Sequence, residues 1–245
     1  MIEAEIELLT VDGPMKTFVT RPEEGGPHPL VLFYMDAPGK REELHDMARR
    51  IATTGYAVLL PNLYYREAPE YELDFNGGQP AIDRMFELMR TLSNAMIVSD
   101  TRALLDYADG ESQIDAQRVG CVGYCMSGPF SLAVAAAYPE RVRAAASIYG
   151  VSLATDRPDS PHLGLSRTKG ELYVAAAETD EYAPPEMIAA LERAFDETKV
   201  SGRIEWYPGT HHGFAFPGRV GAYDKVAAER HWERLHALFD RTLRS

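Results

Sequence analysis

The chain has 245 residues, of which 45% are hydrophobic and 25% are charged, and these values are ordinary for a soluble globular protein. A chain of this length fits one large domain over residues 1–245, with a core that needs neither disulfides nor a structural metal. The formal net charge of −12 argues against nucleic acid or an anionic membrane surface as a partner, because both are bound by clustered lysine and arginine.

The start of the chain, MIEAEIELLTVDG, lacks the basic and apolar regions of a signal peptide. No apolar run approaches the roughly 20 residues that a membrane span needs. The two cysteines, Cys121 and Cys125, have neither the number nor the spacing of a disulfide framework or a zinc site. The sequence therefore predicts a cytoplasmic protein without a cofactor or a metal ion.

Hydrophobic runs bounded by turn residues predict the strands. The first two runs flank the turn sequence DGP and indicate an antiparallel hairpin. The later runs are mostly continuous and apolar, as expected for parallel strands that are buried on both faces. The expected strands cover residues 5–11, 15–20, 30–35, 56–61, 118–124, 143–150, 171–177 and 203–208.

Helical patterns lie between these strands. In residues 40–55 the apolar positions Leu44, Met47, Ala48 and Ile51 follow the spacing of one helix face. Further helices are expected at 94–108, 127–138, 184–198 and 224–243. The alternation predicts an α/β fold with a mostly parallel central sheet, the N-terminal antiparallel hairpin and helices on both faces. Two long irregular stretches, 61–80 and 151–170, follow strand ends, where open α/β sheets bind ligands.

The segment GYCMSG, residues 123–128, joins an expected strand to an expected helix. It matches the nucleophile elbow G-x-S-x-G with Cys125 in place of serine, and Gly123 and Ser127 are the small residues that such a sharp turn requires. The N-terminus of the following helix favours a thiolate at this position. Ser127 fits less well as the nucleophile, because Cys125 and Pro129 would then flank it. Cys121 lies inside the strand and is expected to be a core residue.

A thiol nucleophile needs a basic partner and an acid that orients it. In α/β-hydrolases the order along the chain is nucleophile, acid, histidine, each in a loop after a strand. The segment AETDEY offers Glu178, Asp180 and Glu181, and the segment YPGTHHGF offers His211 and His212. Spacing alone leaves both choices open.

These motifs make the chain resemble the dienelactone hydrolase family of α/β-hydrolases over essentially its full length. GYCMSG is similar to the cysteine elbow of that family, AETDEY to its acid loop and YPGTHHGF to its histidine loop. The resemblance implies a catalytic triad of Cys125, Asp180 and His212. It also implies an acidic residue, here Asp36, that contacts the resting nucleophile, and the alternative is that Asp36 is a loop or helix-cap aspartate.

Two positions depart from the better-known members of the family. Ser127 stands where those members have a second glycine, and Phe216 stands near the place of an arginine that binds a substrate carboxylate. Arg219 lies farther along the chain, and Arg84 or Arg90 could also supply a positive charge. An acidic dienelactone is therefore not the expected substrate.

We expect a hydrolase of small carboxylic esters or lactones that forms a thioacyl enzyme, with the backbone N–H groups of Met126 and Ala37 as the oxyanion hole. The alternatives are the same triad acting on thioesters or phosphate esters, and a catalytically silent α/β-hydrolase domain that binds ligands. The expected partner is a small molecule, and the expected state is a monomer or a homodimer. The loop aromatic residues suggest a largely apolar, neutral substrate. The expected pocket residues are Tyr64, Tyr65, Tyr71, Phe75, Arg84, Tyr124, Phe214 and Phe216.

Overall fold

The computed structural model describes residues 1–244 and contains one eight-stranded sheet in the order β1-β2-β4-β3-β5-β6-β7-β8. β2 pairs antiparallel with both β1 and β4, and all other neighbouring strands are parallel. The predicted hairpin is thus confirmed, and it extends the sheet at one edge. The strands are β1 (Ile2–Thr10), β2 (Gly13–Arg21), β3 (His28–Tyr34), β4 (Ala57–Pro61), β5 (Ile114–Tyr124), β6 (Val142–Ile148), β7 (Glu171–Thr179) and β8 (Gly202–His211).

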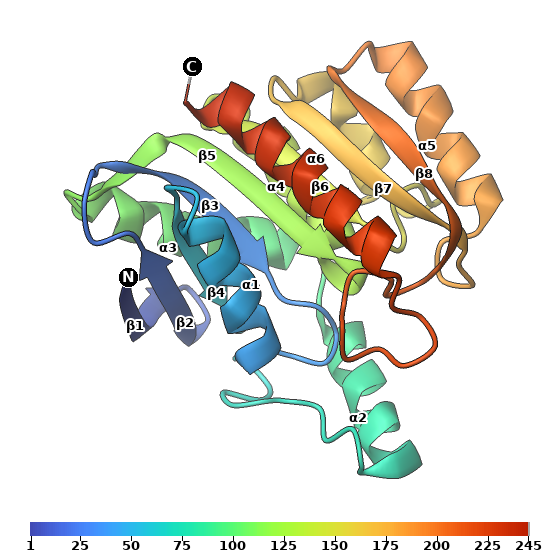
Figure 1. Ribbon diagram of the computed structural model, residues 1–245, viewed down its shortest axis with the longest axis horizontal. Coiled ribbons are helices and arrows are strands. Elements are labelled where there is room, and N and C mark those ends of the chain that lie inside the picture. Colours follow the sequence, from blue (N-terminus) through green and yellow to red (C-terminus); the bar gives the residue numbers. More distant parts are fainter. Residues whose placement is uncertain (245) are drawn as a thin grey trace.

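Helices cover both faces of this sheet, as the alternating pattern predicts (Figure 1). α1 and α6 lie in front of the sheet in that view, and α3 and α4 lie behind it. The α-helices are α1 (Glu42–Ala52), α2 (Gly78–Thr91), α3 (Asn94–Gly110), α4 (Gly128–Ala137), α5 (Pro185–Thr198) and α6 (Lys225–Leu243). Two 3₁₀ helices, η1 (Cys125–Ser127) and η2 (Pro161–Arg167), complete the described chain.

Local sequence explains why these elements form where they do. The central strands β4, β6 and β7 are almost entirely buried, because a parallel strand between two helix layers has no exposed face. In α1 the predicted stripe of Leu44, Met47, Ala48 and Ile51 is buried against the sheet. Ser93 and Asp224 cap α3 and α6, since their side chains accept hydrogen bonds from first-turn N–H groups.

α2 was not expected from the sequence, which predicted irregular structure up to residue 80. The chain is irregular after β4 and then forms α2 from Gly78. This helix projects away from the sheet at the bottom of Figure 1. Only Met85 and Leu88 of its residues are buried. α2 is therefore an addition to the layered core rather than a part of it.

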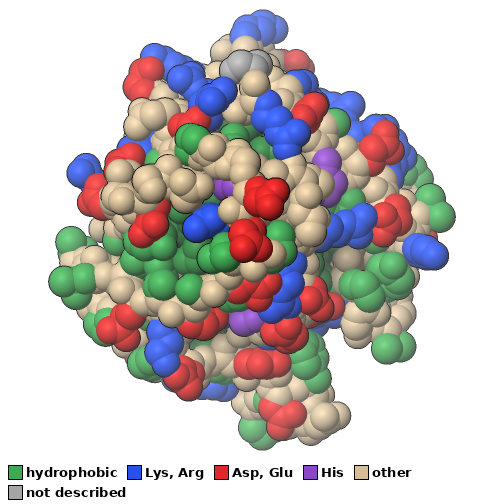
Figure 2. Space-filling model, turned by 60° about the vertical axis from the view of Figure 1, so that its left-hand side comes forward, with side chains coloured by type: hydrophobic (Ala, Val, Ile, Leu, Met, Phe, Trp, Pro, Cys, Tyr) green, Lys and Arg blue, Asp and Glu red, His purple; other side chains and the backbone are tan. Residues whose placement is uncertain are grey.

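The surface carries charges of both signs. On the face shown in Figure 2, acidic and basic side chains are interspersed. Arg49, for example, lies 2.9 Å from Glu3, 2.6 Å from Glu42 and 2.7 Å from Asp46. Such exposed pairs add about 0–1 kcal/mol each to stability. Within residues 1–244, no helix has both the length and the apolar character that crossing a membrane would require.

Candidate active site

Six connections meet at one end of the sheet. They follow the carboxyl ends of β3, β4, β5, β6, β7 and β8, and parallel strands bring these ends together. The connection after β5 carries Cys125, the one after β7 carries Asp180, and the one after β8 carries His212. The structure thus gathers the three predicted triad residues at a single site.

Cys125 lies on a strained turn between β5 and α4. Its φ of 55° is in the left-handed region, which is uncommon for a residue with a side chain. Gly123 is required two residues earlier, because a Cβ there would lie 2.0 Å from the carbonyl oxygen of Ser127. The turn places the partly exposed Cys125 side chain at the carboxyl end of the central strands. This is the geometry that the sequence of the elbow predicts.

The Ser127 hydroxyl points into the protein. It is fully buried, lies 2.9 Å from the carbonyl oxygen of Tyr34, and accepts a hydrogen bond of 3.0 Å from the N–H of Tyr124. These contacts tie the elbow to the end of β3. They give the serine a structural role and leave Cys125 as the side chain that faces the site.

His212 and Asp180 form a close pair. The Nδ1 atom of His212 lies 2.7 Å from Oδ2 of Asp180, whose side chain is buried. The other oxygen, Oδ1, accepts hydrogen bonds from the N–H groups of Tyr182 (2.9 Å) and Ala183 (3.2 Å). Asp180 is thereby held in place, and the Nε2 atom of His212 is left to face the cysteine.

The other candidates for the base and the acid, His211, Glu178 and Glu181, do not face the site. The His211 side chain is exposed, and so are those of Glu178 and Glu181. The carboxylate of Glu178 accepts a hydrogen bond of 2.6 Å from the N–H of Gly209. Only His212 and Asp180 of these candidates are paired with each other.

The pKa of His212 is raised from its ordinary value to about 10. Burial acts in the opposite direction and is the largest single influence, but hydrogen bonds to Asp180 and Cys125, and the negative charges of both, outweigh it. His212 therefore holds a proton at neutral pH in this environment.

The two residues expected to form the oxyanion hole, Met126 and Ala37, lie next to Cys125 and in the cavity wall, respectively. Met126 is the second residue of η1, at a helical start whose first N–H groups have no partner within the helix. Ala37 lies in the turn after β3 and lines the same cavity as Cys125. Over residues 1–244, no hydrogen bond to the Ala37 N–H is found.

Asp36 is bound differently from what the family resemblance implies. It is buried, and its oxygens lie 2.5 Å and 3.2 Å from the guanidinium of Arg41, which is buried as well. Arg219 approaches the same carboxylate at 3.4 Å. No hydrogen bond joins Asp36 to Cys125 in the described part of the chain. Both Asp36 and Cys125 line the cavity, but the carboxylate oxygens of Asp36 are paired with the two arginines.

A cavity of about 420 Å³ opens beside Cys125 and His212. One wall comes from α2, whose side chains Ile82, Met85, Phe86 and Met89 follow the spacing i, i+3, i+4, i+7. This α2 stripe is an amphipathic pattern that sequence inspection could have found. The remaining lining residues are Asp36, Ala37, Pro38, Leu73, Phe75, Tyr149, Val151, Ser152, Tyr182, Gly213, Phe216 and Arg219.

Of the expected pocket residues, Phe75 and Phe216 line this cavity and the others lie elsewhere. Tyr65 is buried with its hydroxyl against Thr10 and Asp100, and Tyr124 and Phe214 are buried beneath the site. The outward-facing Arg84 pairs with Glu87. Tyr71 packs on Tyr64, which is buried behind the turn after β3. Long-range hydrogen bonds and packing, which local sequence does not encode, explain the difference.

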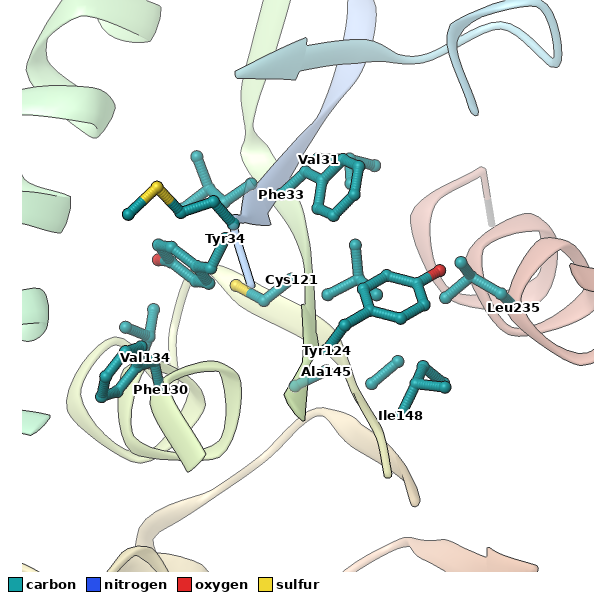
Figure 3. Packing of buried hydrophobic residues seen from close by; sticks show 14 of the residues in the cluster. Val31, Phe33, Tyr34, Cys121, Tyr124, Phe130, Val134, Ala145, Ile148 and Leu235 are labelled. Atoms are coloured by element: carbon teal, nitrogen blue, oxygen red, sulfur yellow. The ribbon is translucent and has the colours of Figure 1, made fainter. Parts of the chain in front are cut away.

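Cys121 belongs to the core. Figure 3 shows its side chain among buried hydrophobic residues that include Tyr34, Phe33 and Ala145. Burial raises its pKa far above the ordinary value for a thiol. A sulfur atom in this position stays protonated and out of reach. The expectation that Cys121 fills the core is confirmed.

Comparison with known proteins identifies the family of the chain. A family model for the dienelactone hydrolase family matches residues 15–243. A Synechocystis protein assigned as a carboxymethylenebutenolidase is 29% identical over 231 residues, which cover 93% of this chain and 92% of that protein. A Bradyrhizobium protein assigned as a 2-oxo-3-(5-oxofuran-2-ylidene)propanoate lactonase is 23% identical over 219 residues, or 88% of this chain and 84% of that protein.

Solved structures show the same fold. A Klebsiella pneumoniae protein assigned as a dienelactone hydrolase superposes with a TM-score of 0.86 at 23% identity, covering 97% of this chain and 98% of that one. A dienelactone hydrolase-like promiscuous phosphotriesterase from metagenomic libraries gives 0.78 at 22% identity, with 99% of each chain covered. The chain has the α/β-hydrolase fold and belongs to the dienelactone hydrolase family of hydrolases.

Proposed function

We propose that this protein hydrolyses neutral, largely apolar carboxylic esters or lactones through Cys125, His212 and Asp180. The observation that carries the proposal is the meeting of three features at one cavity. These are a cysteine on a strained elbow, a histidine whose pKa that cysteine helps to raise, and a buried aspartate 2.7 Å from the histidine. A nucleophile, a base and an orienting acid in this order define a covalent acyl-transfer mechanism.

In the resting pair Nε2 of His212 holds the proton of the Cys125 thiol, so acylation begins from a thiolate beside an imidazolium. The thiolate attacks the carbonyl carbon, and the π electrons of the carbonyl move to its oxygen, which the N–H groups of Met126 and Ala37 stabilise. The bond to the leaving oxygen then breaks, and that oxygen takes the proton from His212. Asp180 stabilises the charged imidazole throughout.

Deacylation repeats these steps with water. His212 removes a proton from a water molecule, whose oxygen attacks the thioester carbonyl. The carbon–sulfur bond breaks as the tetrahedral intermediate collapses, the acid product leaves, and the proton on His212 restores the resting pair. In a lactone the alcohol stays tethered to the acyl group, so water must attack before the ring closes again.

The cavity wall supports a neutral and apolar substrate. The α2 stripe offers four hydrophobic side chains, and Phe216 adds an aromatic ring to the lining. Arg219 is the arginine that lines the cavity, and it already lies against the Asp36 carboxylate and over the rings of Phe75 and Phe216. A buried apolar surface of this kind stabilises a ligand by about 25 cal/mol per Å² of apolar area that it covers.

A thiolate nucleophile stays active in a reducing compartment, so the proposed chemistry fits the cytoplasm. Phosphate triesters are the second substrate class, because the structural relative from metagenomic libraries is named for that activity. The same thiolate would attack phosphorus in place of carbon, the alkoxide or aryloxide would leave with the proton from His212, and water would then displace the cysteine sulfur from phosphorus.

The test is hydrolysis of p-nitrophenyl butyrate by the wild type, Cys125→Ala and the control Cys121→Ala, with paraoxon as a parallel substrate. We expect a burst of p-nitrophenol equal to the enzyme concentration. Loss of the nucleophile should lower kcat by at least about 10³-fold. Iodoacetamide should alkylate Cys125 alone and stop turnover, and Cys121→Ala should keep the wild-type rate.

Equal rates in the wild type and Cys125→Ala would exclude a cysteine nucleophile. Absence of turnover with esters, lactones, thioesters and paraoxon would favour a silent binding domain. Turnover of paraoxon above that of every ester would move the assignment to phosphate esters.

A further inference from the structure

The Tyr64 hydroxyl joins the two segments that carry the proposed oxyanion hole. It donates a hydrogen bond of 2.9 Å to the carbonyl oxygen of Ala37 and lies 3.2 Å from Sδ of Met126. Tyr64 comes from the loop after β4, so three segments distant in sequence meet at one buried oxygen atom. The Ser127 hydroxyl makes a second link between these parts of the chain, because it lies 2.9 Å from the carbonyl oxygen of Tyr34 at the end of β3.

The turn after β3 shows why this contact matters. The Ala37 N–H belongs to the same peptide plane as the Asp36 carbonyl, which accepts a hydrogen bond of 3.1 Å from the N–H of Gly39. The next peptide plane contains the Ala37 carbonyl, which Tyr64 holds. Hydrogen bonds therefore hold the peptide planes on both sides of the Ala37 Cα atom, and together they fix the direction in which the Ala37 N–H points.

Tyr64 is itself rigid. Its backbone N–H donates 3.0 Å to the side-chain oxygen of Asn62, and its ring packs edge-on against Tyr71 with centroids 5.4 Å apart. The Asn62 amide in turn donates to the carbonyl oxygens of Ala68 and Pro69. Burial raises the pKa of Tyr64 well above the ordinary value of a phenol, so the hydroxyl remains a donor at any pH at which the protein is folded.

We propose that Tyr64 is a positioning residue that aligns the N–H groups of Ala37 and Met126 for the tetrahedral intermediate. The inference rests on the proposed function of this site. Tyr64 does not line the cavity, so it acts through these two residues and touches no substrate. Its effect should therefore appear in the transition state and not in the binding of substrate.

The chain supplies a matched control in the next residue. Tyr65 is buried in the same loop, and its hydroxyl bonds Thr10 (2.6 Å) and Asp100 (2.9 Å), away from the site. Tyr64→Phe and Tyr65→Phe each remove one buried hydroxyl and leave the ring. Only Tyr64→Phe removes the hydrogen bond to the Ala37 carbonyl oxygen.

The experiment measures kcat and KM with p-nitrophenyl butyrate, inhibition by a trifluoromethyl ketone, and the backbone amide resonances of Ala37 and Met126. Removing one oxyanion donor lowers kcat by about 10²–10³-fold in well-studied enzymes, and a misaligned donor should cost about 10-fold. We expect Tyr64→Phe to lower kcat about 10-fold with KM unchanged. It should weaken the ketone, which mimics the tetrahedral intermediate, by the same factor, and Tyr65→Phe should do neither.

The amide resonances separate failure of this inference from failure of the proposed function. They should move in Tyr64→Phe and stay in place in Tyr65→Phe, whether or not the wild type hydrolyses esters. Unmoved resonances, or equal kcat values in the two variants, would overturn the positioning role. A wild type without turnover, but with the resonance shift, would overturn only the proposed hydrolysis.

Discussion

The two cysteines differ in what surrounds their sulfur atoms. Cys121 is enclosed between β3, β6 and α4, whereas Cys125 sits at the sheet edge beside an imidazole. Only three residues lie between the inert thiol and the proposed nucleophile. Cys121 lies within β5 and is therefore buried in the core. Cys125 follows β5 on the elbow, which places its side chain outside the core.

The elbow makes a sharp prediction about Gly123. In Gly123→Ala the new Cβ would lie 2.0 Å from the Ser127 carbonyl oxygen, so the turn must open and Cys125 must move. We expect a loss of more than about 2 kcal/mol in the free energy of unfolding, measured by urea denaturation, together with loss of ester hydrolysis.

The control for this change is Gly110→Ala at the end of α3, where a Cβ would meet no atom within 4 Å. That variant should match or slightly exceed the wild type in stability, since alanine favours a helix. A stable and active Gly123→Ala would contradict the description of the elbow.

At the scale of the elements, α2 presents one face to the cavity and another to solvent. Phe86 belongs to the α2 stripe, whereas the half-exposed Arg84 pairs with Glu87 on the other side. Phe86→Ala should lower kcat/KM for p-nitrophenyl octanoate about 10-fold, because a long acyl chain loses apolar contact. Hydrolysis of the acetate should change less than about 2-fold by the same reasoning.

Arg84→Ala should leave both esters unaffected. Equal losses for octanoate and acetate in Phe86→Ala would mean that the stripe supports the catalytic residues and does not contact the acyl chain. The ratio of the two specificity constants is therefore the quantity to follow.

The elements that form the core were predictable, and the cavity wall was not predicted. Buried parallel strands have continuous apolar runs, and α1 and α6 carry stripes that face the sheet, so each pattern has a single structural explanation. The stripe of α2 has the same spacing but faces an open cavity. Its sequence follows an irregular loop and offers no capping side chain at Gly77.

In the site, too, some residues could be predicted from the sequence and others could not. Turn chemistry identified Cys125, because a left-handed residue between small neighbours needs a special sequence. Spacing could not separate His212 from His211, or Asp180 from Glu178, since each pair follows one strand end and only the folded backbone decides which side chain faces inward. The resemblance to a family supplied that choice. The buried partners of Tyr64 and Tyr65 depend on contacts more than 25 residues away, which local patterns do not contain.

At the scale of the whole molecule, His231 connects the C-terminal helix to the central strand. Its Nε2 atom lies 3.0 Å from the Tyr124 hydroxyl, and its Nδ1 lies 2.5 Å from the carbonyl oxygen of Ala228. The ring is fully buried, and burial lowers its pKa to about 3. The neutral form therefore joins α6 to the end of β5, directly before the elbow.

This arrangement predicts sensitivity to acid. The pKa of His231 is below its unfolded value of about 6.5, so its stabilising effect is complete above pH 6.5 and is lost as the pH falls toward 3. Urea denaturation of the wild type and His231→Gln at pH 7.5 and pH 5.0 tests this. The stability difference between the two proteins should shrink by about 2 kcal/mol at the lower pH. A difference that is the same at both values would assign the acid sensitivity to other groups.

The position of α2 outside the layered core has a consequence for how this protein can change. A substitution in the sheet or in α6 alters packing that every other element shares, so most such changes are removed by loss of stability. The α2 stripe lines the cavity, and three of its four side chains, Ile82, Phe86 and Met89, are only partly buried, so substitutions there disturb less of the shared packing. A library confined to positions 82, 85, 86 and 89 should therefore yield mostly folded proteins with divergent substrate ranges.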